Sequence, residues 1–316
     1  MPKNKKNLVL GAILVVLVGF AYGYYYYQNQ DQARANNFVS DLDFSQVDKM
    51  VVERTGSSTT LLKQEEGWKV EGTKDFYVRE SRTEDIKKGL TDLTEVNFEL
   101  VSTNQDKKEL YHTDLEHGSH LELYQGEEKA ADFVVGRLDS PTVTHTYISR
   151  PDSEETYLAK NVQLTAMFLE KDWRSKVVFN NPDKEVKKLR FQYPEEEFTA
   201  EKKKTSEGED KWEITEPNFR ETNSEKLAQI EDLMTNLIAT RIPEQSFAGT
   251  GLEKHLIIVE AQGDGFQNTI MVGEAKEDED NGTLYYAKKG SSDNIYLITE
   301  EERNLLKTSV EELASE

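Results

Sequence analysis

The chain has 316 residues and no cysteine, and its 60 Asp and Glu residues outnumber its 39 Lys and Arg residues, which gives a formal net charge of −21 at pH 7. The absence of cysteine excludes disulfides, thiolate zinc sites, iron–sulfur clusters and cysteine nucleophiles. The negative charge repels nucleic acid and anionic lipid headgroups, so neither is an expected partner.

The N-terminal part of the sequence predicts a membrane anchor. Residues 8–27 carry no charged side chain, and as a helix they would extend roughly 30 Å, the thickness of the hydrocarbon core of a bilayer. Residues 1–7 contain three lysines and no acid, so this tail is expected in the cytoplasm and the rest of the chain outside it. Leu8 begins the anchor, and Tyr22 and Tyr27 are expected toward its outer interface.

A cleaved signal peptide is the alternative to a retained anchor. Its apolar region is normally about 7–15 residues long and ends in a small-x-small site, which Ala21-Tyr22-Gly23 matches poorly. We therefore expect a single-pass protein of the inner (cytoplasmic) membrane, with most of the chain in the periplasm or an equivalent extracytoplasmic space.

Two similar groups of predicted elements follow a polar stalk over residues 28–45. In the first group, strands are predicted at 47–54, 59–65 and 67–72, a helix from Thr83 as N-cap to Leu100, four strands at 120–125, 131–136, 145–149 and 155–159, and a helix over 162–171. In the second, strands are predicted at 186–193, 197–204 and 210–217, a helix over 224–240, four strands at 255–262, 268–274, 283–289 and 294–299, and a helix from Glu300.

The same landmark residues recur in both groups, in the same order and 135–144 positions apart. The pairs are Trp68 and Trp212, Leu115 and Leu252, His120 and His255, Gly136 and Gly273, Tyr147 and Tyr286, and Tyr157 and Tyr296. A period of this length indicates a duplicated domain rather than a solenoid repeat. The two tryptophans are expected in the cores, and the two glycines are attributed to strand-end backbone geometry rather than to ligand contact.

The predicted fold class is therefore α+β, with an N-terminal transmembrane helix followed by two tandem repeats of a mostly antiparallel sheet packed on one long helix. The expected domains are a cytoplasmic tail (1–7), the transmembrane helix (8–27), the stalk (28–45), a first repeat (46–179) and a second repeat (180–316).

The motifs "TDLE", "FVVG…TYIS…ETYLA" and "DWRSKVVF" resemble the bacterial domain-of-unknown-function family numbered 4340 over about residues 40–310. Gly251-Leu252, Val272-Gly273, Tyr286 and Tyr296 match the family pattern, whereas Asp114 replaces the glycine in the first repeat. The resemblance implies a single-pass envelope protein associated with an auxiliary subunit of a gliding-motility-type ABC transporter. It supplies no catalytic residues.

His112, His117 and His120 are the only weak candidates for a metal site. Asp114 and Glu116 lie between them in the sequence, and imidazoles near carboxylates can bind zinc or another transition metal. The spacing matches no standard zinc pattern, so loop histidines without a metal are the expected outcome.

Catalytic motifs of the nucleophile-elbow, Walker A, H-E-x-x-H and S-x-x-K types do not occur. We therefore expect no enzyme activity and no cofactor. The favoured function is a membrane-anchored accessory or scaffold subunit of an ABC-type transporter complex, whose partner is the permease or its auxiliary subunit. The alternative is an extracytoplasmic ligand-binding module for an envelope glycan or lipid.

Overall fold

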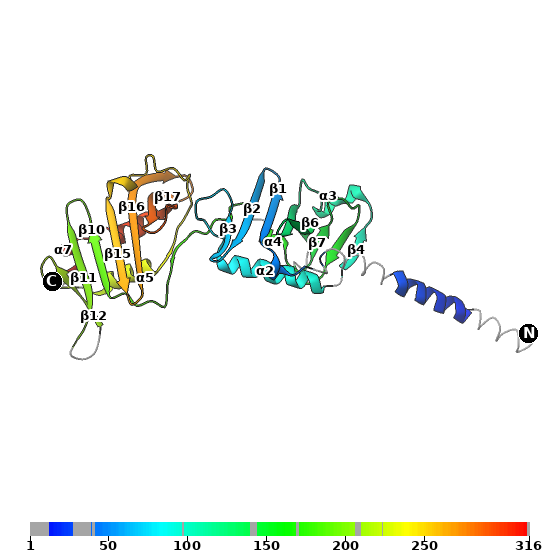
Figure 1. The fold of residues 1–316 in the computed structure, drawn as a ribbon, viewed down its shortest axis with the longest axis horizontal. Coiled ribbons are helices and arrows are strands. Elements are labelled where there is room, and N and C mark those ends of the chain that lie inside the picture. Colours follow the sequence, from blue (N-terminus) through cyan, green and yellow to red (C-terminus); the bar gives the residue numbers. More distant parts are fainter. Residues whose placement is uncertain are drawn as a thin grey trace, which may run out of the picture. The chain divides into compact units, whose positions relative to one another are not determined.

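The computed structural model describes residues 13–27, 39, 42–96, 98–139, 144–168, 171–205, 210–222 and 224–314. The chain forms two compact units. The first contains the residues up to Glu71 and Glu80–Trp173, and the second contains Gly72–Arg79 and Arg174–Glu316. Each unit has its own large sheet and its own long helix (Figure 1).

The first unit contains an eight-stranded sheet in the order β3-β2-β1-β5-β6-β7-β8-β4, and every neighbouring pair is antiparallel. Its elements are η1 (Phe44–Gln46), β1 (Lys49–Arg54), β2 (Ser57–Gln64), β3 (Gly67–Val70), α2 (Glu80–Glu95), β4 (Phe98–Ser102), η2 (Gln105–Lys107), α3 (Lys108–Tyr111), β5 (Ser119–Gln125), β6 (Glu128–Leu138), β7 (Thr146–Ser149), β8 (Thr156–Ala159) and α4 (Thr165–Phe168).

The second unit contains an eight-stranded sheet in the order β13-β12-β11-β10-β15-β16-β17-β18, and a two-stranded sheet, β14-β9. Its elements are β9 (Val177–Asn180), β10 (Lys188–Gln192), β11 (Glu197–Lys204), β12 (Asp210–Glu216), β13 (Arg220–Glu221), α5 (Ser224–Thr235), β14 (Asn236–Ile238), η3 (Leu252–Lys254), β15 (Ile257–Gly263), β16 (Phe266–Asp278), β17 (Gly282–Lys289), β18 (Ile295–Thr299), α6 (Glu300–Leu306) and α7 (Val310–Leu313).

The two sheets repeat one topology. The run β3-β2-β1-β5-β6-β7-β8 in the first sheet corresponds strand for strand to β12-β11-β10-β15-β16-β17-β18 in the second. The long helix comes at a similar point of the chain in both units: α2 follows β3, and α5 follows β12 and the short β13. The prediction of an α+β protein with large antiparallel sheets is confirmed.

Each long helix buries an apolar stripe at helical spacing, as expected of a helix that covers a sheet. The helix α2 runs across the lower end of the first sheet in Figure 1 and buries Ile86, Leu90 and Leu93. In the second unit, Leu227 and Ile230 of α5 belong to the buried core together with Trp212. Trp68 is buried as well, so the prediction that the two tryptophans lie in the cores is confirmed.

Three predicted ends of the two long helices are wrong. The helix α2 begins at Glu80 and ends at Glu95, so Thr83 is not its N-cap and Leu100 lies in β4. Similarly, α5 ends at Thr235 and is followed by β14. In both cases a short apolar run fits a helical or a two-residue period equally well, and pairing with β8 or with β9 makes it a strand.

Of the helix predicted over 162–171, Thr165–Phe168 are helical, 162–164 and 171 are not, and residues 169–170 lie outside the described residues. The C-terminal helix starts at Glu300 as expected, because Thr299 and Glu302 form a capping box, but α6 ends at Leu306 and α7 follows separately.

The division into units differs from the predicted boundary between residues 179 and 180. Arg174 already belongs to the second unit, because β9 pairs with β14 and the Ala239 N–H donates to the Lys176 carbonyl at 2.8 Å. The segment Gly72–Arg79 also departs from the prediction. It lies in sequence between two stretches of the first unit but belongs to the second unit.

Phe76 explains why Gly72–Arg79 belongs to the second unit. Its side chain is 1% exposed and is part of the second core. The ring meets Tyr296 edge-on at a centroid distance of 5.7 Å, and the Arg174 guanidinium lies 5.3 Å from the ring centroid. The Ser292 hydroxyl also donates to Asp75 at 2.9 Å. The chain therefore passes between the units three times, at 71/72, 79/80 and 173/174.

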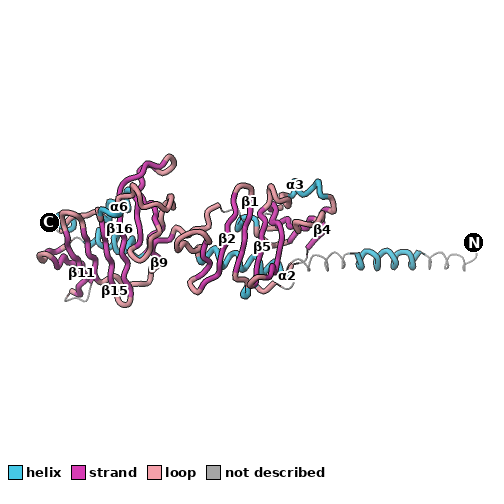
Figure 2. The backbone as a smooth tube through the Cα atoms, turned by 45° about the horizontal axis from the view of Figure 1, so that its top comes forward, coloured by secondary structure: helices cyan, strands magenta, loops and turns pink. Residues whose placement is uncertain are grey.

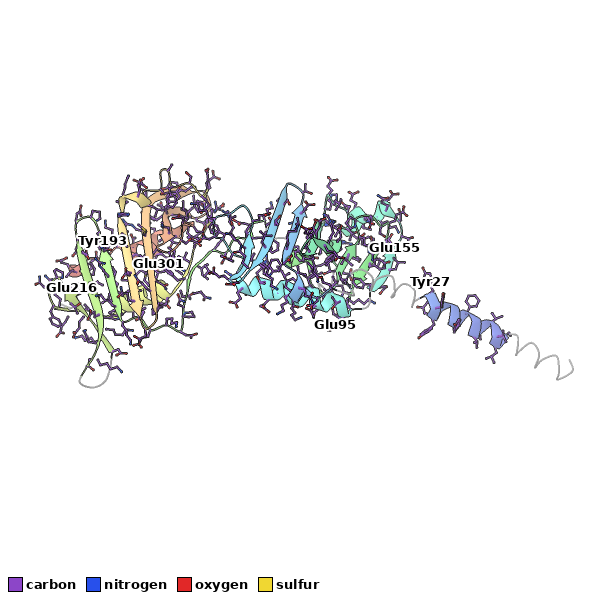
Figure 3. All side chains as sticks on the ribbon, viewed as in Figure 1. Tyr27, Glu95, Glu155, Tyr193, Glu216 and Glu301 are labelled. Atoms are coloured by element: carbon purple, nitrogen blue, oxygen red, sulfur yellow. The ribbon has the colours of Figure 1, made fainter. Side chains whose placement is uncertain are left out.

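Residues 13–27 form a helix, from which Tyr27 projects (Figure 3). Among the described residues, no helix is long and apolar enough to cross a membrane. Leu8, the rest of the predicted anchor before residue 13, the cytoplasmic tail and most of the stalk lie outside the described residues.

Candidate functional site

A cluster of polar side chains lies on one face of the first sheet, over its three central strands β1, β5 and β6. Leu121 and Leu123 of β5 are buried, so the alternating residues His120 and Glu122 point to the opposite face. Figure 2 shows β1 and β5 side by side, and the register pairs Glu53 of β1 with His120.

The next strand completes this cluster. Glu122 is paired directly with Asp132 of β6, and directly paired residues project from the same face of a sheet. The three central strands thus bring His120, Glu122, Asp132 and Glu53 together, although these residues span 80 positions of the chain. We call these four residues and Lys129 the His120 cluster.

The imidazole of His120 lies between two carboxylates. Its Nε2 is 2.8 Å from Asp132 Oδ1, and its Nδ1 is 3.1 Å from Glu53 Oε2. Carboxylate oxygens only accept, so both hydrogen bonds form together only when each ring nitrogen carries a proton. The His120 side chain is 13% exposed, which makes this the most enclosed residue of the cluster.

Lys129 joins the two carboxylates of the paired strands. Its Nζ donates to Glu122 Oε1 at 2.5 Å and to Asp132 Oδ2 at 2.8 Å, and the Tyr124 hydroxyl donates to Glu122 Oε2 at 2.7 Å. Burial alone would raise the pKa of both carboxyl groups. The hydrogen bond from Lys129, a second hydrogen bond (from Tyr124 to Glu122 and from His120 to Asp132) and the charge of Lys129 together outweigh burial and hold the pKa of each below its ordinary value. The same bonds to Asp132 and Glu122 raise the pKa of Lys129.

These residues offer metal-ligand atoms at close range. One atom each from His120, Glu122 and Asp132 lie within 4.8 Å of one another, and this is the only such group of three in the part of the chain that the structure describes.

The three histidines that the sequence singled out do not converge on one site. His117 Nδ1 lies 2.9 Å from Asp114 Oδ1, and this hydrogen bond raises the pKa of His117. His112 ends α3 in the left-handed region at φ 55°, with its ring centroid 5.7 Å from that of His117. Only His120 belongs to the cluster, because it alone lies within a strand of the sheet.

A model of the family described as "Domain of unknown function (DUF4340)" matches residues 68–248, which is more than half of the chain. The chain belongs to the DUF4340 family. No curated protein and no solved structure matches it. His120, Glu122, Asp132 and Lys129 lie within the matched region of this DUF4340 protein, whereas Glu53 lies before it.

The second repeat of this DUF4340 protein lacks the His120 cluster. In the first repeat, Val134 lies two positions before Gly136 and pairs with His120. In the second repeat, Met271 lies two positions before Gly273 and pairs with Ile258. The structural counterpart of His120 is therefore Ile258. His255, which the sequence comparison paired with His120, precedes β15 and adopts a left-handed conformation at the end of η3.

Gly136 and Gly273 have the same structural role in the two repeats. A Cβ atom on Gly136 would lie 2.5 Å from the Tyr111 carbonyl oxygen, and one on Gly273 would collide with the Thr250 carbonyl oxygen. Each glycine thus allows a loop to pack directly on a sheet strand, close to an irregularity in strand pairing. The prediction that backbone geometry explains these glycines is confirmed, although both lie within a strand rather than at its end.

The sequence carried a signal for the His120 cluster, but not a sufficient one. His120-Leu121-Glu122 alternates polar and apolar residues, which predicts one exposed face. The contributions of Asp132 and Glu53 depend on which residues face each other across strands, and that pairing is not encoded in any local pattern.

Proposed function

We propose that the protein is a non-enzymatic accessory or scaffold subunit, held in the cytoplasmic membrane by one N-terminal helix. Its two sheet units act outside the cytoplasm on a partner membrane protein. The partner class is an ABC-type transporter permease or its auxiliary subunit, as the family resemblance implies.

The N-terminal helix is the observation that carries this proposal. From Ile13 to Val18 every side chain is apolar and more than half exposed, and Phe20 is 77% exposed. A helix that is apolar on all sides is stable in an apolar surrounding, not in water. The five residues before it, "LVLGA", extend the uncharged stretch in sequence, which supports a length of roughly 30 Å and a membrane-spanning role.

Exposed apolar side chains on the two units support a role in protein contact. Leu110 and Leu115 are exposed on the first unit, and Phe219 and Ile238 on the second. Leu115 is 56% exposed, whereas its counterpart Leu252 is 2% exposed, so the fold does not require exposure at this position. These exposed apolar side chains are the candidates for contact with another protein on the two units.

The absence of native cysteine allows a clean test of the anchor. Intact cells that carry one of two single-cysteine variants, Asn4→Cys or Ser57→Cys, would be treated with a thiol reagent that does not cross membranes. We expect labelling of Ser57→Cys only, with labelling of Asn4→Cys after permeabilisation. The unsubstituted chain is the matched control, because it contains no thiol. Equal labelling of both sites in intact cells would contradict the proposed topology.

The partner is tested separately, by crosslinking the full chain in cells and identifying proteins that co-purify in mild detergent. A transporter permease or auxiliary subunit in near-stoichiometric amount supports the accessory role. A double variant, Leu110→Ser with Leu115→Ser, should reduce that recovery if the first unit makes the contact. Recovery of the protein alone would contradict the accessory role and favour the ligand-binding alternative.

A further inference from the structure

We propose that His120, Glu122 and Asp132 form a binding site for a divalent transition-metal ion such as Zn²⁺. This site is independent of the proposed accessory role and does not involve the predicted combination of His112, His117 and His120.

The three ligand residues lie close together on two neighbouring strands. His120 and Glu122 are two positions apart on β5, and Asp132 is directly opposite Glu122 on β6. Their ligand atoms lie within 4.8 Å of one another. Tetrahedral zinc holds its ligands at about 2.0–2.2 Å, which places neighbouring ligand atoms about 3.3 Å apart. The 2.8 Å separation of His120 Nε2 and Asp132 Oδ1 thus needs to open only slightly.

The ligand atoms of these residues suit a transition metal. One imidazole nitrogen and two carboxylate oxygens are ligands that zinc and neighbouring transition metals accept, whereas Mg²⁺ and Ca²⁺ prefer oxygen alone. The three side chains are partly buried, at 13%, 18% and 35% exposed. Water can complete the coordination, as it does where a protein supplies three ligands.

Glu53 lies where an outer carboxylate would hold the second ring nitrogen of a metal-binding histidine. Metal-binding histidines usually donate their second ring N–H to a carboxylate, which fixes the ring and raises its basicity. Glu53 Oε2 lies 3.1 Å from the Nδ1 of His120, while Nε2 faces Asp132. The ring is therefore already oriented with Nε2 toward the ligand oxygen of Asp132 and with Nδ1 held by an outer carboxylate.

The fold does not need His120, Glu122 and Asp132 at these positions. The structurally equivalent strands of the second unit carry Ile258 and Glu260 on β15, and Thr269 opposite Glu260 on β16. That unit builds the same sheet without a histidine or a paired carboxylate at these positions. The His120 cluster is thus a specialisation of the first unit rather than a requirement of the topology.

Lys129 competes with the ion. Its ammonium group bonds to Glu122 Oε1 and to Asp132 Oδ2, the Asp132 oxygen that faces away from His120. An arriving dication must displace the ammonium from Glu122 and the proton from His120 Nε2. With a neutral imidazole, the three carboxylates of the His120 cluster and the ammonium of Lys129 have a net charge of −2. A dication compensates this charge. Removing Lys129 should therefore tighten metal binding.

The experiment is a Zn²⁺ titration of the full-length protein in detergent, with a chromophoric chelator as competitor and thermal unfolding as a check on folding. We expect one ion per chain, a loss of at least tenfold in affinity for Asp132→Asn and for His120→Asn, and a loss of about tenfold or more for Glu53→Gln. Lys129→Gln should bind more tightly than the unsubstituted chain. This gain is informative because a damaged fold would not produce it.

The matched control is the double variant His112→Asn with His117→Asn, which removes the other two histidines of the segment and should leave the affinity unchanged. Two results would overturn the proposal. One is a correctly folded protein for which neither the unsubstituted chain nor Lys129→Gln competes with the chelator. The other is loss of binding in the double variant while Asp132→Asn still binds, which would place the ion elsewhere.

Discussion

Replacing Phe76 by alanine should destabilise the second unit, although this residue precedes most of the first unit in sequence. The ring is 1% exposed and packs in the second core. Truncation of a fully buried phenylalanine typically costs about 3–5 kcal/mol, because apolar contact is lost and a cavity remains. The edge-on contact with Tyr296 accounts for part of that loss, since ring pairs of this kind contribute about 0.5–1.5 kcal/mol.

Hydrogen exchange measured peptide by peptide tests this expectation, because it reports on the two units separately. A loss of 3–5 kcal/mol corresponds to exchange on the order of 10²–10⁴-fold faster for amides that open with the second unit. We expect this acceleration in peptides from β15 and β16, and little change in those from β5 and β6. The control is Phe133→Ala, which truncates a fully buried phenylalanine of β6 and should accelerate exchange in the first unit.

Faster exchange in the first unit alone after Phe76→Ala, or no change anywhere, would refute the assignment of Gly72–Arg79 to the second unit. The same reasoning concerns fragments. A chain of residues 174–316 lacks Phe76, so we expect it to expose an apolar site and to unfold at lower denaturant concentration than the second unit within the whole protein.

Three further predictions concern single positions. Gly273→Ala should lower stability by about 1–3 kcal/mol, because the added methyl group meets the Thr250 carbonyl; an unchanged melting temperature would contradict this. His117 should titrate by NMR above the ordinary histidine pKa of about 6.5 and return toward it in Asp114→Asn, since the hydrogen bond to Asp114 raises its pKa; an unmoved midpoint would exclude that cause. Thr299→Ala should cost about 0.5–2 kcal/mol in urea unfolding through loss of the capping box, and a loss below this range would show that α6 is held by packing alone.

The sign of the His117 effect follows from its pKa. Because the folded pKa is raised, the stabilisation from the pair with Asp114 is fully present below the unfolded pKa of histidine and is lost as the pH rises through the folded value. For Asp114, burial acts to raise the pKa, but the hydrogen bonds from His117 and from the Glu116 N–H, with the charge of His117, together outweigh it and the folded pKa is lowered. Its stabilisation is therefore lost as the pH falls through the folded value. The pair contributes most between the two unfolded values, and a stability that rose with pH through the histidine range would contradict this.

The sequence by itself determined the class of fold and its duplication. Alternating strands and an apolar helical stripe, as in Leu121 and Leu123 or Ile86 and Leu90, are local patterns that report which side chains turn inward. Trp68 and Trp212 are predicted as core residues because large aromatic side chains usually lie inside such sheets. The landmark glycines could be interpreted because Gly136 and Gly273 recur at equivalent points of both repeats.

Only the tertiary structure decided where elements end and which distant residues meet. Leu100 follows a helix and is apolar, and only its pairing with β8 shows that it lies in a strand. Phe76 is an apolar residue in a loop, and its place in the second core follows from contacts with residues about 100–220 positions away. The His120 cluster depends on the strand register, which places Glu53 and Asp132 beside His120 and gives the second unit Ile258 instead. A two-residue period shows which face a side chain occupies, but its neighbours on that face depend on long-range packing that fixes the register of whole strands.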